Sequence, residues 1–507
     1  MVFSAARANS SWTRTVVATL LTGLSEHQHK VYERGDVLGN DVATMAEALE
    51  AAGYGTAAWS TNANILPLWG FGQGFDHFFD AGASTWPARK TDAADLLAQV
   101  RSFLDAHTEK PGLYYIHFMD AHAPYQPTEA ELARVAADER LARAFPGDRD
   151  DPKAPAVQQD FRRYLSEIGG MDEQIGLFMD ELRRRGLYDG SLVLLLSDHG
   201  EEFLDHGDTD HGKTLFEEML RVPVILKLPG NAGAGTRVEE SIEVVDLLPS
   251  VLRILDLPVP PGLPGVVLWN GTAIAALTPR PSVASLRLDE YESDAALQEG
   301  WKLIVDRGEA PALYSLRDDP GERKPRRDEA RERVLQEHMA SAQTPLEAGW
   351  HIRACGGVHA GNFRFTLRCA TPPRGWGLEV NDRVRRLPAG DSLYEVVLSL
   401  DKRSRGLVYV EDTDDLVLPA TPDGPFLELS GNVRYRLGRD EQQQAGNTLR
   451  LDPRTGGVQV NGAIECPKLE PAKSFVRIWY TPPARQIPDA DVDPEVRERL
   501  RQLGYGD

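Results

Sequence analysis

Hydrophobic and polar positions follow two different periods along the first half of the chain. Three segments with apolar residues at helical spacing are each followed by an apolar run of strand length: 41–55 then 56–60, 92–108 then 112–120, and 164–188 then 191–200. The last run, "SLVLLLSDHG", is almost wholly apolar, which predicts a strand buried on both faces, as in a parallel sheet. We therefore expect an α/β fold with a mostly parallel central sheet flanked by helices.

The pattern changes after Leu257. The turn-rich stretch "PVPPGLPG" marks a boundary, "GWKLIVDRGEAPALYSL" is typical of a β-hairpin, and short alternating strands dominate from Trp350 to Tyr480. We predict four regions: an α/β domain over 1–325, a charged helical linker over 326–348, a β-rich, sandwich-like module over 349–485 and a tail helix over 486–507.

The amino-acid composition argues against several classes of function. The formal net charge of −21 at pH 7 argues against a general nucleic-acid or anionic-membrane binder, which would be basic. The chain has no run of about 18 consecutive apolar residues, so no transmembrane helix is predicted. The cysteines Cys355, Cys369 and Cys466 are odd in number and form no C-x-x-C pair, which predicts neither a disulfide framework nor a thiolate zinc site. One Cys355–Cys369 bridge would suit an exported protein.

Residues 10–23, "SSWTRTVVATLLTG", have two interpretations. Arg7 and Arg14 before or within a short apolar run resemble a signal peptide, but no small-residue cleavage site follows the run. The alternative is a strand-to-helix turn that belongs to an active site.

The strongest candidate chemistry lies in "SDHGEEFLDHGDTDHGK". Asp198 and His199 follow the apolar strand at its carboxyl end, the edge at which open α/β sheets place their sites. A carboxylate beside an imidazole suits a divalent cation. His211 and Lys213 follow on the same stretch. A single Asp-His pair is more often a solvated loop, so the surrounding sequence decides between these interpretations.

That surrounding sequence closely resembles the sulfatase family of the alkaline-phosphatase superfamily. The resemblance is carried, in the family's order, by "TLLTGLSEHQHKV", "TMAEALEAAGYGTAAWSTN", "YIHFMDAHAPYQP", "GGMDEQIG" and "SDHGEEFLDHG…DHGKTLFEEMLRVPVILKLPG", and it extends from residue 1 to about 325. It implies metal-assisted hydrolysis or transfer at a sulfate or phosphate ester, and a catalytic role for the α/β domain.

The resemblance also places the nucleophile at Thr13, with Arg14 beside it, which favours the active-site interpretation of residues 10–23. Typical sulfatases have Cys or Ser here, in a C/S-x-P-x-R pattern that is oxidised to formylglycine. "TRTVV" lacks that pattern, and oxidation of Thr would give a ketone. We therefore expect no formylglycine but a metal-activated Thr alkoxide, as in nucleotide phosphodiesterases and phosphoethanolamine transferases, with phosphoester or phosphodiester chemistry favoured.

The remaining roles are implied by the same resemblance. Zn, Mn or Ca would be held by Asp198, His199, Thr13 and His211. His122 would contact the transferred group or a second metal. His211 would ligate a second metal, and Lys213 is its rival, because sulfatases have a lysine near this position that touches the ester. Arg14 and Asn62 would bind substrate. His117 and Asp120 are assigned to packing and to the turn that they flank.

The family normally begins with a strand that ends in Asp, followed by a helix, about 30–40 residues at ordinary element lengths. We expect this chain to lack both and thus to be one carboxylate ligand short. The alternative function is therefore a non-catalytic pseudoenzyme whose residual pocket and β module bind a ligand or a protein. The expected substrate is a small-molecule, glycan-linked or lipid-linked ester, with no nucleic acid. The partner of the β module and the compartment stay open.

Overall fold

A computed structural model describes residues 1–39, 42–81, 91–107, 111–260, 263–269, 280–289 and 291–342, and beyond these the backbone of strands between 349 and 486. The chain divides into two compact units. The first comprises Met1–Pro258, Gly265–Met339 and Arg485–Asp507, and the second Val259–Pro264 and Ala340–Ala484. The tail helix predicted over 486–507 lies outside the described residues, except for Gln486, which belongs to a short strand.

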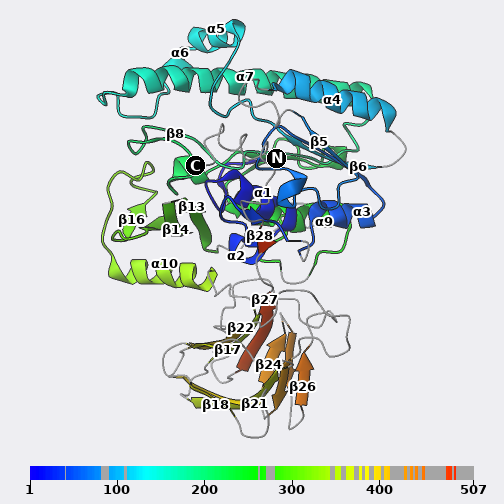
Figure 1. Cartoon of the computed structure of the whole chain (residues 1–507). Helices are drawn as coiled ribbons and strands as arrows, with labels where there is room; N and C mark the ends of the chain where they lie inside the picture. The colour runs from blue at the N-terminus through cyan, green and yellow to red at the C-terminus, as the bar shows by residue number, and fades with distance from the viewer. Residues whose placement is uncertain are drawn as a thin grey trace. The chain divides into compact units, whose positions relative to one another are not determined.

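A parallel sheet forms one layer of the first unit. β4 (Gly55–Ser60) lies between β5 (His77–Asp80) and β6 (Gly112–His117) and is parallel to both. The amphipathic helix α4 (Ala93–Ala106) packs Leu96 and Val100 against Trp59 of β4, and α7 (Ala154–Arg184) joins the same core through Phe178. Figure 1 shows α4 and α7 side by side above the sheet. The α/β fold with a parallel sheet and covering helices is thus confirmed.

A second sheet has the order β11 (Arg237–Val238), β1 (Val2–Phe3), β10 (Val224–Lys227) and β7 (Val193–Leu196). β10 is antiparallel to both of its neighbours, whereas β1 and β11 are parallel, so this sheet is mixed. β7 lies at its edge, and all four of its residues are half-buried. Because successive residues of a strand point to opposite faces, half-burial of all four means that both faces of β7 are partly covered, which is less than the full burial that the apolar run 191–200 predicts.

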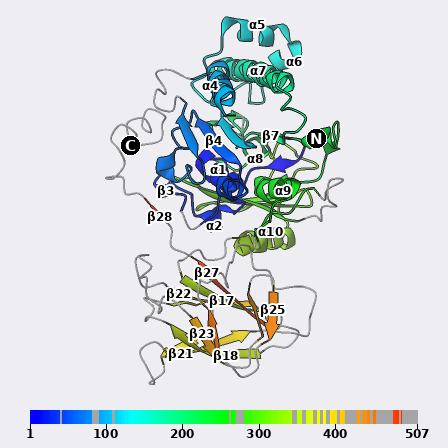
Figure 2. The same cartoon turned by 90° about the vertical axis from the view of Figure 1, so that its right-hand side faces the viewer.

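Helix α1 (Thr13–Thr22) lies in the centre of the first unit in both views of the fold (Figures 1 and 2). All ten of its residues are buried. Val16 and Leu20 pack against the core of the mixed sheet, whereas Val17 and Leu21 pack against a separate apolar cluster around Trp69. The apolar stretch that resembles a signal peptide is thus a core helix of this fold. Over the described residues, no helix is long and apolar enough to span a membrane.

The predicted hairpin is confirmed as β15 (Trp301–Asp306) and β16 (Ala312–Ser315), which extend β13 (Ser282–Leu288) and β14 (Tyr291–Gln298) into an antiparallel sheet. Helix α10 (Glu329–Ala342), in the segment predicted as a linker, packs Leu335 and Met339 on this sheet. The shorter elements of the first unit are α2 (Glu26–His29), α3 (Met45–Ala51), α5 (Glu129–Ala137), α6 (Glu139–Ala142), α8 (Glu217–Leu220), α9 (Leu247–Ile254), β2 (Ala6–Arg7), β3 (Asp36–Val37), β8 (Glu202–Phe203), β9 (Thr209–Asp210), β12 (Ile242–Glu243) and β28 (Arg485–Gln486).

The second unit contains two sheets, as the strand pattern predicts. The six-stranded sheet has the order β19 (Trp376–Leu378), β22 (Arg405–Glu411), β17 (Gly349–Cys355), β27 (Phe475–Thr481), β24 (Arg434–Leu437) and β25 (Asp440–Gln443). The five-stranded sheet has the order β20 (Arg383–Arg386), β21 (Leu393–Leu400), β18 (Gly361–Cys369), β23 (Leu427–Ser430) and β26 (Thr448–Leu451). Cys355 and Cys369 end strands of different sheets.

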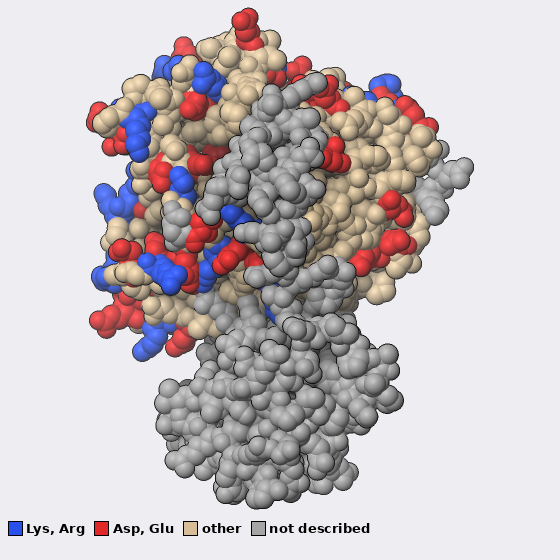
Figure 3. Space-filling model, in the orientation of Figure 1, with Lys and Arg blue, Asp and Glu red and all other residues tan. Residues whose placement is uncertain are grey.

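Charged side chains of the first unit are interspersed in sign over the face shown in Figure 3. Several form exposed ion pairs, such as Arg134 with Glu173 and Arg143 with Glu139. Pairs of this kind contribute about 0–1 kcal/mol each, so they do little to hold the fold.

A buried polar cluster beneath α1 makes stability depend on pH. The Glu26 carboxylate accepts a hydrogen bond from Asn9 Nδ2 at 3.0 Å, and burial raises the pKa of Glu26 from 4.5 to about 7. The folded protein therefore holds this proton more tightly than the unfolded chain. The resulting stabilisation, about 3 kcal/mol, is complete below pH ~4.5 and is lost as the pH rises to about 7.

Glu26→Gln is expected to remove this loss between about pH 4.5 and 7, because Gln keeps the acceptor oxygen and does not titrate. His27 and His29, whose pKa values burial lowers to about 4 and about 3, act in the opposite sense in both proteins. Urea unfolding at a series of pH values checks the difference between the two curves. Parallel curves would contradict the assignment.

Candidate active site

Thr13 is the first residue of α1 and is 2% exposed. Trp12 precedes it in an extended conformation and offers no side-chain cap to the helix. Thr13 Oγ1 lies 3.0 Å from His199 Nε2, a residue 186 positions away in the sequence. The fold therefore brings the helix start and the loop after β7 together.

Asp198 also contacts this hydroxyl. Its Oδ2 is 3.4 Å from His199 Nε2, and it also accepts a hydrogen bond from Thr13. Burial opposes ionisation of Asp198, yet the imidazoles of His199 and His117 and the Thr13 hydroxyl hold its pKa at about 2. Its side chain stays 25% exposed. At neutral pH Asp198 is thus an ionised carboxylate that a ligand can reach.

His199 is held as a neutral imidazole. Burial lowers the pKa of His199, although the negative charge of Asp198 acts to raise it. Its Nδ1 lies 2.8 Å from the Gly200 carbonyl, which accepts the Nδ1 proton and leaves a lone pair on Nε2. The Thr13 hydroxyl has one proton, which it can donate to this lone pair or to Asp198, but not to both at once. A neutral imidazole, an ionised carboxylate and a hydroxyl are the protonation states that bind a divalent cation, so this donor set fits the metal that the sequence predicts.

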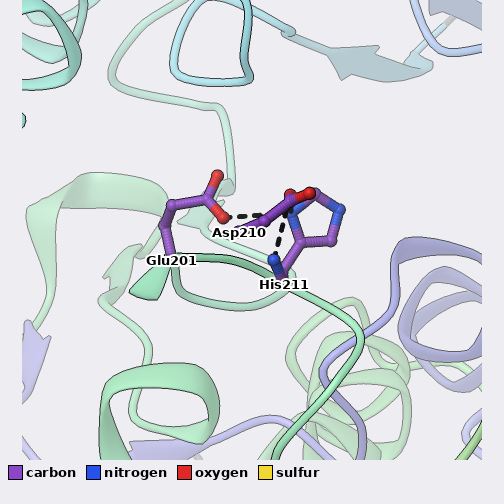
Figure 4. A group of neighbouring side chains, drawn as sticks. All are labelled: Glu201, Asp210 and His211. Carbon is purple, nitrogen blue, oxygen red and sulfur yellow. Dashed lines mark hydrogen bonds and ion pairs between the residues drawn. The ribbon is translucent and has the colours of Figure 1, made fainter. Parts of the chain in front are cut away.

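A second group of donors lies on the β8–β9 hairpin and on the residues directly before and after it (Figure 4). Ligand atoms of Glu201, Asp210 and His211 lie within 4.8 Å of one another. His211 Nδ1 is 3.2 Å from Glu201 Oε1 and 3.1 Å from Asp210 Oδ1. The His211 and His199 rings stack with centroids 4.3 Å apart, so the two groups of donors are contiguous.

His122 and Tyr125 extend this second group. The rings of His122 and His211 meet edge to face at 5.0 Å, and burial and the neighbouring His211 lower the pKa of His122 to about 4. His122 is therefore neutral at pH 7. The Tyr125 hydroxyl donates to Glu201 Oε2 at 3.2 Å and fixes that carboxylate.

Asn62 and His117 lie at the carboxyl ends of the parallel strands. Asn62 Nδ2 is 3.4 Å from His117 Nε2, while Asn62 Oδ1 accepts from the backbone of Asn64. Burial lowers the pKa of His117, and Asp198 acts against this lowering. His117, assigned from sequence to packing, is thus electrostatically coupled to Asp198.

Arg14 and Lys213 each bind other groups of the protein. Arg14 is fully buried, stacks over Trp69 at 4.0 Å and donates to the Arg34 carbonyl and to Asn64 Oδ1. Lys213 Nζ donates to Asp208 Oδ1 at 3.1 Å and to the Thr209 carbonyl at 2.8 Å. Both cations hold backbone segments in this conformation.

Sequence reasoning did not find Glu201, Asp210 and Tyr125. The available signals were the acidic residue directly after "SDHG" and the second Asp-His pair at 210–211. Neither signal says that the hairpin folds back onto the loop, which is what makes Glu201 and Asp210 neighbours.

A threonine hydroxyl, a carboxylate and imidazoles that an α/β fold brings together are typical of metal-assisted ester hydrolases. The Sulfatase family profile matches residues 1–257, and the chain belongs to that family. This membership supports a hydrolase that acts on a sulfate or phosphate ester.

Curated relatives are distant. The chain is 23% identical over 389 residues to the uncharacterised sulfatase YidJ of Escherichia coli, an alignment that covers 62% of this chain and 74% of that protein. It is 25% identical over 266 residues to the human N-sulphoglucosamine sulphohydrolase, covering 48% of this chain and 51% of that protein, and 24% identical over 274 residues to an ulvan-active sulfatase of Formosa agariphila, covering 49% and 53%. The chain spans about half the length of the last two.

Solved structures share the fold. A protein called BT4656, solved with D-glucosamine-2-N,6-O-disulfate, has a TM-score of 0.55 at 18% identity, covering 68% of this chain and 89% of that one. The phosphonate monoester hydrolase of Agrobacterium radiobacter has a TM-score of 0.54 at 19% identity, covering 67% and 86%.

Proposed function

We propose that the protein hydrolyses or transfers a phosphate ester or diester through attack by Thr13. The observation that carries this proposal is the position of the Thr13 hydroxyl, 3.0 Å from His199 Nε2 and hydrogen-bonded to Asp198. A divalent cation, when bound, would lower the pKa of the hydroxyl and neutralise charge on the ester. Asp198, His199 and Thr13 would hold it.

The protein's own residues then orient the reaction. Asp198 and His199 contact the Thr13 hydroxyl and hold it in place, and the ionised Asp198 carboxylate can accept the hydroxyl proton. His211, fixed by Glu201 and Asp210, and the neutral His122 lie next to His199, where they would bind a second cation or the leaving oxygen. Threonine cannot give formylglycine, which supports phosphoester over sulfate-ester chemistry. The proposed substrates are small-molecule, glycan-linked or lipid-linked esters.

A substrate panel with defined metals tests this function. Purified protein, stripped with a chelator and reloaded with Zn²⁺, Mn²⁺ or Ca²⁺, is assayed on p-nitrophenyl phosphate, bis(p-nitrophenyl) phosphate and p-nitrophenyl sulfate. We expect no turnover after chelation, recovery with one of the metals, and a preference for the phosphorus esters. A preference for the sulfate contradicts the phosphoester assignment. Absence of turnover with every metal, together with tight metal binding, favours the non-catalytic alternative.

Substitution of His211 is expected to lower kcat/KM more than substitution of Lys213. His211→Ala removes an imidazole that stacks on His199, and we expect kcat/KM to fall on the order of 10²-fold, as for removal of a transition-state donor. Lys213→Ala removes a cation that binds Asp208 and the Thr209 carbonyl, so the expected loss is several-fold. Steady-state kinetics on the best panel ester check this order. A larger loss of kcat/KM in Lys213→Ala than in His211→Ala would favour Lys213 as the residue that contacts the ester.

A further inference from the structure

Glu201, Asp210 and His211, here called the 201–211 cluster, have the spacing of ligands around one metal ion (Figure 4). His211 Nδ1 lies 3.2 Å from Glu201 Oε1 and 3.1 Å from Asp210 Oδ1. Zinc bonds of about 2.0–2.1 Å in a tetrahedral site put neighbouring ligand atoms roughly 3.3–3.4 Å apart. Both distances from Nδ1 are close to this spacing, and the three atoms lie within 4.8 Å of one another. Small movements of the two carboxylates would therefore place all three atoms around one ion.

The charges of the cluster are not balanced by the protein. The Glu201 side chain is only 6% exposed, and among the described residues neither Glu201 nor Asp210 forms an ion pair with a lysine or an arginine. Lys213, the lysine nearest in sequence, binds Asp208 instead. Even a protonated His211 would balance only one of the two carboxylates. Because buried carboxylates are normally paired with a cation or coordinate a metal, the cluster has room for a further positive charge.

Contacts from outside the three donor atoms hold the cluster in place. The Tyr125 hydroxyl donates to Glu201 Oε2 at 3.2 Å, which leaves Oε1 for a cation. The backbone N–H of His211 donates to Asp210 Oδ1 at 3.0 Å and fixes the orientation of that carboxylate. Hydrogen bonds of this kind orient the ligands of metal ions. The Asp210 side chain is 56% exposed, so an ion and its remaining water ligands can reach the cluster from solvent.

We propose that the 201–211 cluster binds a zinc ion of its own, in addition to the cation that Asp198 and His199 would hold. Two carboxylate oxygens and an imidazole nitrogen suit zinc, whereas calcium and magnesium prefer oxygen ligands alone. The ion would take the place of the proton on His211 Nδ1, and a neutral ring then carries its proton on Nε2. The inference rests on the proposed function in one respect, because it decides between the second cation and the leaving oxygen as the partner of His211. Its test measures bound metal and not turnover.

Zinc counting on the full-length chain tests the proposal. Protein stripped with a chelator is dialysed against buffered free Zn²⁺, bound zinc is counted by mass spectrometry, and affinity is measured by competition with a chromophoric chelator. The test variant is Asp210→Asn. The matched control is Asp208→Asn, which removes a carboxylate of similar exposure from the same hairpin. We expect two zinc ions in the unchanged protein and in the control, and one in the test variant. The affinity of the cluster should fall by more than the roughly 10–100-fold that loss of an outer hydrogen-bond partner costs.

Asp198→Asn distinguishes the two metal sites. This variant is expected to lose the other zinc ion and to keep the ion of the 201–211 cluster. Two ions retained in Asp210→Asn, equal loss in Asp208→Asn, or a single ion that Asp198→Asn abolishes would each overturn the proposal. A single ion that only Asp210→Asn abolishes would support the cluster and contradict the cation assigned to Thr13. The two proposals therefore fail separately.

Circular dichroism and thermal melting of the metal-free proteins check the fold of each variant. If Asp210→Asn does not fold, Glu201→Gln replaces it, because Gln keeps an oxygen for the Tyr125 hydroxyl and loses the anionic ligand. Glu201→Gln is expected to bind one zinc ion under the same conditions. Two bound ions in this variant would also overturn the proposal.

Discussion

Thr13→Ala is expected to lower kcat on the preferred ester by on the order of 10³-fold or more, as removal of a nucleophile does in other hydrolases. The hydroxyl lies against both His199 and Asp198, and among the described residues no other hydroxyl is hydrogen-bonded to either of these side chains. Ser10 and Ser11 are buried in the turn before α1. Burst kinetics and steady-state rates with the reloaded metal measure the loss.

Thr13→Ser is the matched variant, because it keeps the oxygen and removes only a methyl group. We expect it to retain turnover within about an order of magnitude. Urea unfolding of both variants separates loss of chemistry from loss of fold. Turnover that survives Thr13→Ala in a correctly folded, metal-loaded protein would exclude Thr13 as the nucleophile.

Lys302→Met is expected to lower the free energy of unfolding by about 3–5 kcal/mol, the cost of breaking a buried ion pair from one side. Lys302 is 1% exposed, and its Nζ lies 2.9 Å from Glu322 Oε1 and 3.2 Å from Glu217 Oε1. Glu217 also binds Arg7, at 2.8 Å, and therefore keeps a cation when Lys302 is removed. The Glu322 side chain is 0% exposed. Without Lys302, Glu322 becomes a buried carboxylate that has lost its cation.

The loss in Lys302→Met should depend on pH. Burial raises the pKa of Glu322, and Lys302 acts against this rise, so removing the lysine raises that pKa further. A raised folded-state pKa gives stability that is present at low pH and lost as the pH rises. The variant should therefore be closer to the unchanged protein at pH 5 than at pH 8. Urea unfolding at both values measures this difference.

Arg134→Ala is the control for Lys302→Met. Its partner Glu173 and Arg134 itself are about half-exposed, and the expected loss is below about 1 kcal/mol at either pH. A loss of that size in Lys302→Met would contradict the buried-pair assignment.

Local pattern predicted much of this protein. The α/β class follows from helical and apolar segments that alternate, and the hairpin 301–315 follows from its two strands and turn. The motif around residues 197–213 led to Asp198 and His199, and the resemblance placed Thr13, which lies 3.0 Å from His199. These inferences rest on residues that are close in sequence, or on a motif that follows the end of a single strand.

The sequence also allows one to predict that the Arg14 side chain does not point the same way as the Thr13 side chain. Successive residues on a helix are about 100° apart around its axis, so Arg14 cannot face the same way as Thr13. The structure accordingly finds it between Trp12 and Trp69, holding the Arg34 carbonyl.

What the sequence by itself determined is thus the class of fold, the Sulfatase membership, and the residue types that could carry the chemistry. Only the tertiary structure decided which of them meet. It turned Lys213 toward Asp208, brought His211 between two carboxylates and against His199, and left β7 as a half-buried edge strand. The reason is physical: periodicity records which side of an element is apolar, whereas neighbours across a hairpin or at a sheet edge are set by long-range packing and pairing that no local pattern encodes.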